Sequence, residues 1–193
     1  MVKDVLLIGD GGHCKSIIDV IEQEGQFKIA GIIGADRPIG SDIFGYKVIG
    51  CDSDIEKFSK KYNYAIVAVG QIHSPEVRIK LFSILAALGF NLPSIVSPRA
   101  YVSIHALIGK GTIIMHDAIV NANAVIGDNC IINSKALIEH DSIVHDHCHI
   151  STNVTINGGV VVGEGSFIGS GAITNNSITI KKNSFYKAGV FIK

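Results

Sequence analysis

Tryptophan is absent from this 193-residue chain, which has only four prolines and four cysteines. The cysteines, Cys14, Cys51, Cys130 and Cys148, are widely separated and form no C-x-x-C pair. They therefore indicate buried thiols of a reducing compartment and not a disulfide framework. The formal net charge is zero, because 17 Lys and Arg balance 17 Asp and Glu. This balance gives no electrostatic reason to expect nucleic acid or an anionic membrane as the partner.

Long hydrophobic runs are missing as well. No apolar stretch reaches the roughly 20 residues that span a bilayer. The N-terminal segment MVKDVLLIGDGGH becomes glycine-rich and polar too early for a signal peptide, so we expect a cytoplasmic protein. In place of these features, the chain has 21 glycines and an excess of Ile and Val, which indicate tight turns and β-structure.

Residues 1–96 alternate between short apolar strands and helices. Residues 5–8, VLLI, are continuously apolar, as expected for a strand of a parallel sheet that is covered on both faces. The glycine turn GDGGH and an amphipathic helix follow. Further strands are predicted at 29–33 and 65–69, and further helices at 54–62 and 75–88. This β-α-β pattern predicts a small Rossmann-like domain.

The second half, residues 97–193, has a period of six. The third place of each hexad, stepping from Val102 to Ile192, offers 16 positions, and Ile or Val fills 14 of them. The exceptions are Thr174 and Tyr186. The first place is mostly small, and Gly, Asn and Asp collect in the last three places, where the chain must turn.

Neither a helix nor an ordinary strand has a period of six. Such a period requires a short strand and a turn in each repeat, and stacked repeats then bury one column of β-branched side chains. The sequence therefore predicts an α/β Rossmann-like domain in residues 1–96, followed by a left-handed parallel β-helix in residues 97–193.

Four segments carry a resemblance to a known family: GDGGH at 9–13, IVAVG at 66–70, INSKALIEHD at 132–141 and HISTNVTINGG at 149–159. With them the chain resembles the hexapeptide-repeat acetyltransferases of bacterial surface-sugar biosynthesis. These include the N-acetyltransferases of nucleotide-linked 4-amino-4,6-dideoxy sugars and the sialic acid O-acetyltransferases. The resemblance implies a homotrimer, a nucleotide-sugar site in the N-terminal domain, and acetyl-CoA bound along the β-helix.

By this resemblance, His140 is the catalytic base and Asp141 raises its basicity. An amine or hydroxyl must lose a proton as it attacks a thioester, and imidazole can accept that proton near neutral pH. Some relatives carry Glu where Asp141 stands, and the shorter side chain leaves its contact with His140 open. Judged by the repeat alone, both residues are better explained as ordinary turn residues of a coil, and it is the match to the local motif that favours the catalytic roles.

The resemblance also implies a set of binding residues. The implied substrate contacts are Gly11, Gly12, His13 and Gly70. Two further candidates are Asp36, which lies just beyond the second predicted strand and could accept hydrogen bonds from uracil or ribose, and Asn133, which could contact the sugar. The acetyl-CoA contacts are His149, Gly158, Ser170 and Ala188, of which Gly158 offers a backbone N–H to the developing oxyanion. Plain coil positions remain the alternative for Ser170 and Ala188, and an inward-facing asparagine ladder remains the alternative for Asn133. A dinucleotide cofactor is disfavoured, because Cys14 replaces the third glycine of G-x-G-x-x-G.

His145, His147 and His149 lie close together around Cys148, but steps of two along irregular coil residues do not make ligands converge, so no metal is expected. Relatives usually continue past the last coil, whereas this chain ends at GVFIK, which leaves the far end of the coenzyme pocket open.

The favoured function is N-acetylation of a nucleotide-linked amino sugar, because His13 is present in the glycine turn. The alternatives are O-acetylation of sialic acid and a non-catalytic β-helical scaffold. The residues IEHD, which a scaffold does not need, argue against the scaffold.

Overall fold

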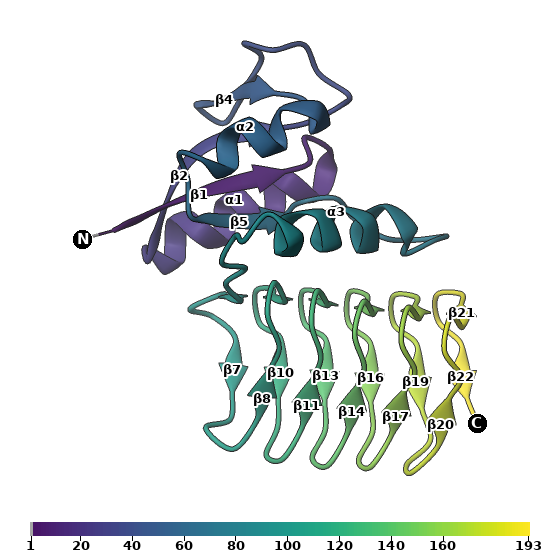
Figure 1. Ribbon diagram of the computed structural model, residues 1–193. Helices are drawn as coiled ribbons and strands as arrows, with labels where there is room; N and C mark the ends of the chain where they lie inside the picture. The colour runs from purple at the N-terminus through teal and green to yellow at the C-terminus, as the bar shows by residue number, and fades with distance from the viewer. Residues whose placement is uncertain (1) are drawn as a thin grey trace. The chain divides into compact units, whose positions relative to one another are not determined.

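The computed structural model describes residues 2–193 and divides the chain into two compact units (Figure 1). The first unit comprises the residues up to Gly70 together with Glu76–Pro93, and the second comprises Gln71–Pro75 and Ser94–Lys193. The sequence places the division at residues 96 and 97. In the structure the short segment Gln71–Pro75, which interrupts the first unit along the chain, belongs with the second.

The first unit is built on one sheet with the strand order β3-β4-β2-β1-β5. Strand β2 is parallel to β1 and β4, β1 is parallel to β5, and only β3 runs antiparallel. In chain order the elements are β1 (Lys3–Ile8), α1 (Gly12–Glu24), β2 (Phe27–Ile33), β3 (Asp42–Ile43), β4 (Tyr46–Gly50), the 3-10 turn η1 (Asp52–Asp54), α2 (Ile55–Ser59), β5 (Tyr64–Val67) and α3 (Glu76–Ala87). This arrangement confirms the predicted α/β domain.

The glycine turn between β1 and α1 is required by close packing. Gly9 has φ 125°, and a Cβ there would lie 2.7 Å from the side chain and 2.8 Å from the backbone nitrogen of Val69. The hairpin of β3 and β4 was not predicted. The predicted helix over 54–62 is shorter than expected, because α2 ends at Ser59 and the chain closes with a tight turn in which Lys61 donates to Phe58.

The second unit is a parallel β-helix of three faces, whose strands stack in order along the axis in Figure 1. Face 1 contains β6 (Ile95–Val96), β9 (Ile113–Ile114), β12 (Ile131–Ile132), β15 (His149–Ile150), β18 (Phe167–Ile168) and β21 (Phe185–Tyr186). Face 2 contains β7 (Tyr101–Val102), β10 (Ile119–Val120), β13 (Leu137–Ile138), β16 (Thr155–Ile156), β19 (Ile173–Thr174) and β22 (Phe191–Ile192). Face 3 contains β8 (Leu107–Ile108), β11 (Val125–Ile126), β14 (Ile143–Val144), β17 (Val161–Val162) and β20 (Thr179–Ile180).

The hexad pattern explains the core. Third-place residues such as Ile132, Ile138 and Val144 are 0% exposed and form one continuous hydrophobic cluster with small first-place residues such as Ala136 and Cys148. This confirms the predicted inward column. Because no single coil can bury its own apolar residues, the stacking of coils is what stabilises each one.

The sixth place of each hexad makes the turn. From residue 111 to residue 189, every sixth residue has a positive φ, including Asn123, Asp141 and Asn153 among the non-glycine residues. An L-residue other than glycine adopts this left-handed conformation at a cost, which Asn and Asp tolerate best. The accumulation of Gly, Asn and Asp late in the hexad therefore follows from backbone geometry.

Candidate active site

His140 and Asp141 form a hydrogen-bonded pair on the turn after β13, which we name corner 2–3 because it joins faces 2 and 3. His140 Nδ1 lies 2.7 Å from Asp141 Oδ2, and Asp141 Oδ1 accepts a hydrogen bond of 2.8 Å from Asn123 Nδ2. A carboxylate only accepts hydrogen bonds, so Nδ1 carries the proton and Nε2 of the neutral imidazole is available as a base. The short side chain of Asp141 does reach His140.

The pair is electrostatically coupled although both side chains are largely exposed, at 65% for His140 and 57% for Asp141. The hydrogen bond that His140 donates to Asp141 raises the pKa of His140; desolvation opposes this effect, and the negative charges of Asp141 and Glu139 add to it. The hydrogen bond from Asn123, followed by that with His140, lowers the pKa of Asp141. The arrangement favours uptake of a proton by His140.

Gly158 lies one coil further along, next to the His140 ring. A Cβ on Gly158 would lie 3.0 Å from both Cε1 and Nε2 of His140, so a larger residue here would push the imidazole from this position. Gly158 is buried, and among residues 2–193 no backbone carbonyl accepts a hydrogen bond from its N–H. A base and a backbone donor therefore lie side by side at this corner.

The other residues predicted on the β-helix lie elsewhere on it. Asn133, Ser170 and Ala188 share the corner between faces 1 and 2, which we name corner 1–2, and His149 lies on β15 beside it. Asn133 Nδ2 is 3.1 Å from His149 Nε2, and Ser170 Oγ is 2.9 Å from Ser151 Oγ. Within one chain, the β-helix thus places His140 and these four residues on different corners.

The predicted substrate residues of the first unit gather where its parallel strands end. A Cβ on Gly70, after β5, would lie 3.5 Å from His13 Cβ, and Cβ atoms on Gly11 or Gly12 would meet open space. Asp36 is exposed on the loop after β2. This carboxyl edge is where open α/β sheets bind ligands.

Two neighbours of these residues support the edge without having been predicted. Asp10 is 3% exposed, and its carboxylate accepts a 2.8 Å hydrogen bond from the Arg37 backbone N–H. Arg37 Nε donates to the Asp10 carbonyl at 3.1 Å. These bonds hold the loop that carries Asp36, and a Cβ on Gly34 would collide with the Asp10 carboxyl.

All four cysteines are free thiols, and Cys14, Cys130 and Cys148 are buried. Burial raises the pKa of Cys14 to about 12, so its thiol stays protonated and is no nucleophile. His147 Nδ1 lies 3.0 Å from Asn129 Nδ2, whereas His149 Nδ1 lies 2.5 Å from the Gln71 carbonyl. Among residues 2–193, no group of three or more His, Cys, Asp or Glu could hold a metal ion.

Contacts between successive coils were missed by the sequence reasoning. Asn121 Nδ2 donates to Glu139 Oε2 at 2.8 Å, as Asn123 does to Asp141, and both pairs are separated by 18 residues. The signal was in the sequence, since three hexads make one coil and residues 18 apart are stacked neighbours.

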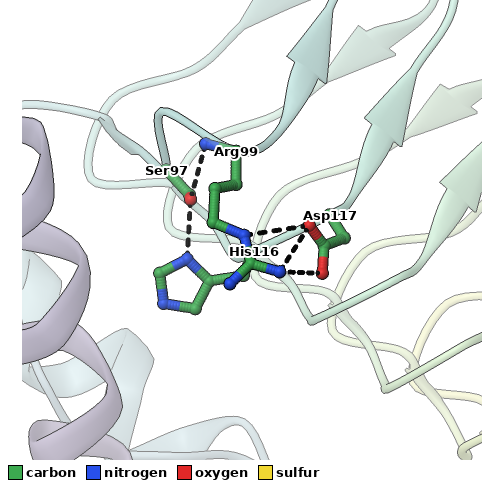
Figure 2. A network of polar contacts seen from close by, with 4 residues as sticks. All are labelled: Ser97, Arg99, His116 and Asp117. Atoms are coloured by element: carbon green, nitrogen blue, oxygen red, sulfur yellow. Dashed lines mark hydrogen bonds and ion pairs between the residues drawn. The ribbon is translucent and has the colours of Figure 1, made fainter.

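A further network, shown in Figure 2, ties the first turn of corner 1–2 to the next coil. Ser97 Oγ lies 2.7 Å from His116 Nδ1 and accepts from the Arg99 backbone N–H, while Arg99 forms an ion pair of 2.7 Å with Asp117. These contacts anchor the start of the β-helix. Among the residues that the structure describes, no helix is long and apolar enough to cross a membrane.

Comparison with known proteins agrees with this geometry. Residues 4–85 match the model of the PglD N-terminal domain, and residues 105–140 match the bacterial transferase hexapeptide model of six repeats. No curated protein matches the chain. The structure is similar to a histidine-to-asparagine mutant of perosamine N-acetyltransferase from Caulobacter crescentus, in complex with CoA and GDP-perosamine. The TM-score is 0.93 at 30% identity, over 100% of this chain and 90% of that one.

The chain belongs to the family of hexapeptide-repeat sugar acetyltransferases. A second similar structure is the acetyltransferase domain of PglB from Neisseria gonorrhoeae FA1090 in complex with acetyl coenzyme A. Its TM-score is 0.89 at 31% identity, over 100% of this chain and 93% of that domain. Membership of this family confirms the predicted fold and the predicted enzyme class, an acyltransferase. The roles of individual residues remain predictions.

Proposed function

We propose that this enzyme transfers an acetyl group from acetyl-CoA to the amine of a nucleotide-linked 4-amino-4,6-dideoxy sugar. The observation that carries the proposal is the His140–Asp141 pair beside the buried backbone of Gly158. The similarity to a perosamine N-acetyltransferase bound to GDP-perosamine, and to an acetyltransferase domain bound to acetyl-CoA, supports both substrates.

In the proposed reaction the sugar nitrogen attacks the thioester carbonyl carbon, and His140 Nε2 takes the proton that the nitrogen loses. The C–N bond forms, the C–S bond then breaks, and the departing thiolate recovers a proton from the imidazolium. Asp141 keeps Nδ1 protonated and stabilises the imidazolium. The Gly158 N–H is the donor proposed for the oxyanion of the tetrahedral intermediate.

We assign recognition of the sugar nucleotide to the carboxyl edge of the first unit. The residues that we assign to it lie just after β1, β2 and β5, near the N-terminus of α1: Gly11, Gly12, His13, Asp36 and Gly70. Backbone N–H groups at a helix N-terminus favour the negative charge of a phosphate, and open space above Gly11 and Gly12 allows close approach.

A homotrimer is the assembly that we propose. Corner 2–3 carries His140 and Gly158, whereas corner 1–2 carries Ser170 and Ala188, which are also proposed for acetyl-CoA, so a neighbouring β-helix is needed to complete each site. Face 2 presents apolar side chains outward: Tyr101, Ile119, Ile173 and Phe191 are between 39% and 59% exposed. Covering such side chains with a second copy removes apolar surface from water.

The cytoplasm is the compartment that we propose, because the four cysteines are thiols and not disulfides, as is typical of a reducing compartment. Transfer to a hydroxyl of sialic acid uses the same base and remains the alternative acceptor. His13 beside Gly70 favours the nucleotide-linked sugar.

The test is a thioester-cleavage assay with acetyl-CoA and a panel of UDP-, GDP- and dTDP-linked 4-amino sugars, with free and CMP-linked sialic acid included. Mass spectrometry of each product locates the acetyl group. We expect an amide on the 4-amino group of one nucleotide sugar. Turnover of sialic acid alone would replace the proposal with O-acetylation.

A further inference from the structure

Gln71 makes three hydrogen bonds to the β-helix although it lies far from it in sequence. Its side chain is 2% exposed, and its Nε2 donates to the carbonyls of His147 at 3.0 Å and Gly165 at 3.4 Å. The reversed amide would point its oxygen at these two carbonyl oxygens, so the orientation is determined. The Gln71 carbonyl, 2.5 Å from His149 Nδ1, makes the third bond.

This third bond fixes the tautomer of His149. A carbonyl oxygen only accepts, so Nδ1 must carry the hydrogen, and Nε2 of the neutral ring is left as an acceptor. Nε2 lies 3.1 Å from Asn133 Nδ2, which can only donate. Asn133 Oδ1 in turn accepts a 2.8 Å hydrogen bond from the Ser134 backbone N–H, which fixes the orientation of the amide.

Aromatic contacts also restrain the orientation of the His149 ring. The ring meets Phe167 edge to face with centroids 5.2 Å apart, Phe167 stacks on Phe185 at 5.2 Å, and Phe185 stacks on His73 at 5.7 Å. His73 and Gln71 both belong to the segment Gln71–Pro75. The segment therefore contacts the ring directly through the Gln71 carbonyl and indirectly through His73, Phe185 and Phe167.

We propose that Gln71 and His149 are positioning residues that present the Asn133 amide to the ligand as a hydrogen-bond donor. Both nitrogens of His149 are engaged within the β-helix unit, and the side chain is 8% exposed, so the ring has no N–H left to offer acetyl-CoA. The second N–H of Asn133, which is half-buried at corner 1–2, is the group that meets a ligand oxygen. The ligand group that it contacts must be a hydrogen-bond acceptor, either a sugar hydroxyl oxygen or a carbonyl oxygen.

This proposal rests on the proposed function for the identity of the ligand, but the state of His149 can be measured without any ligand. Nitrogen-15 NMR of the imidazole distinguishes a protonated nitrogen from an unprotonated one, and His149→Gln identifies the signals of this ring among the eight histidines. In the full-length protein we expect a protonated Nδ1 and an unprotonated Nε2. Protonation at Nε2 alone would overturn the proposal, whatever the enzyme acetylates.

Two variants test the direction of the chain of hydrogen bonds. Asn133→Asp keeps the shape but replaces the donor by an acceptor, so His149 should carry protons on both nitrogens. Gln71→Leu removes both side-chain bonds that anchor the segment but keeps the backbone carbonyl that faces Nδ1. The carbonyl should therefore shift, and the Nδ1 signal of His149 should move. An unchanged His149 spectrum in Asn133→Asp would contradict the tautomer assignment, and an unchanged spectrum in Gln71→Leu would exclude Gln71 as a positioning residue.

Thr112→Val is the matched control for loss of two buried hydrogen bonds. Thr112 is 0% exposed, donates to the Gly127 carbonyl at 2.7 Å and accepts from Cys130 N at 2.9 Å. These two partners, Gly127 and Cys130, are not part of the hydrogen-bond chain through His149. We expect a comparable loss of stability to Gln71→Leu with no change in the His149 signals.

Steady-state kinetics then identify the ligand that Asn133 contacts. Asn133→Asp should raise KM for one substrate about tenfold, because the ligand oxygen loses the N–H that donated to it. A rise for the nucleotide sugar identifies a sugar oxygen, and a rise for acetyl-CoA identifies a coenzyme carbonyl. If neither KM changes while the NMR result holds, the presentation of Asn133 to a ligand is wrong and the tautomer assignment alone survives.

Discussion

The chemistry of the proposed base depends on a few atoms around one imidazole. Asp141 accepts a hydrogen bond of 2.7 Å from His140 Nδ1, and Asn123 donates a hydrogen bond to Asp141. Gly158 has no side chain that would displace Nε2 of His140. None of these groups is unusual alone. Their combination at an exposed corner gives a histidine whose proton affinity is raised while its reactive nitrogen stays accessible to a ligand.

Asp141→Asn tests the electrostatic part of this arrangement. The base must be neutral to accept a proton, so activity rises as the pH passes upward through the pKa of His140. Asp141 raises that pKa, so a neutral Asn should lower it and shift the acidic limb of the kcat/KM profile to lower pH. The plateau rate should also fall, because the weaker base accepts a proton less readily. A limb that stays in place would show that Asp141 does not act on His140.

Gly158→Ala tests the steric part. The added methyl would lie 3.0 Å from two atoms of the His140 ring and should displace the imidazole, which is exposed and can swing outward. We expect kcat to fall about 10- to 100-fold, the cost of misplacing a catalytic group by roughly 1 Å. The denaturation midpoint should change little. A variant with unchanged kcat would exclude close packing of Gly158 and His140 during catalysis.

The corner turns of the β-helix all share one backbone conformation. Every sixth residue from 111 to 189 adopts a left-handed conformation, whether it is Gly, Asn, Asp, Lys, His or Ser. Asp141 belongs to this series, so the same turn that shapes the coil also carries a proposed catalytic carboxylate.

Asn183→Val should therefore destabilise the fold. Asn183 has φ 56°, which a β-branched side chain tolerates poorly, and we expect a loss of about 1–2 kcal/mol in the free energy of unfolding. Thr179→Val is the matched control, because it places the same side chain on the exposed side of β20, where β-branched residues are favoured. Chemical denaturation of both variants provides the comparison. Equal stability of the two would contradict the backbone argument.

Among the secondary-structure elements, the sequence predicts the repeated strands of the β-helix well and the short β3–β4 hairpin poorly. The six-residue period identifies the inward column from Ile114 to Ile180, because a buried β-branched side chain leaves a direct mark on composition. The hairpin β3–β4 leaves no such mark, since two and five residues are too short for a periodic signal.

The partners of the proposed site residues are also hidden from a linear reading. Asn123 could have been found by counting one coil back from Asp141. Gln71 could not have been found in this way, because nothing in the local sequence shows that Gln71–Pro75 belongs to the β-helix unit.

For the whole molecule, the central prediction is that each active site draws on two chains. His140→Ala removes the proposed base at corner 2–3, and Ser170→Trp should block the proposed coenzyme arm at corner 1–2. Each variant alone should be nearly inactive. Trimers assembled from an equal mixture should recover roughly a quarter of the activity, because one site in four then pairs an intact His140 with an intact Ser170.

Mass spectrometry of the intact assemblies provides the control for this experiment. Mixed trimers without recovered activity would place both residues in one chain's site. A monomer in sedimentation at micromolar concentration, with full activity, would rule out the shared site altogether.

The proposed reaction depends most directly on His140. The decisive measurement is kcat for acetyl transfer to the nucleotide-linked 4-amino sugar, compared between the wild-type enzyme and His140→Ala at pH 7. We expect kcat to fall about 10²- to 10⁴-fold, as for loss of a general base, with KM for acetyl-CoA nearly unchanged. A near-normal kcat in His140→Ala at pH 7 would contradict the assignment of His140 as the base.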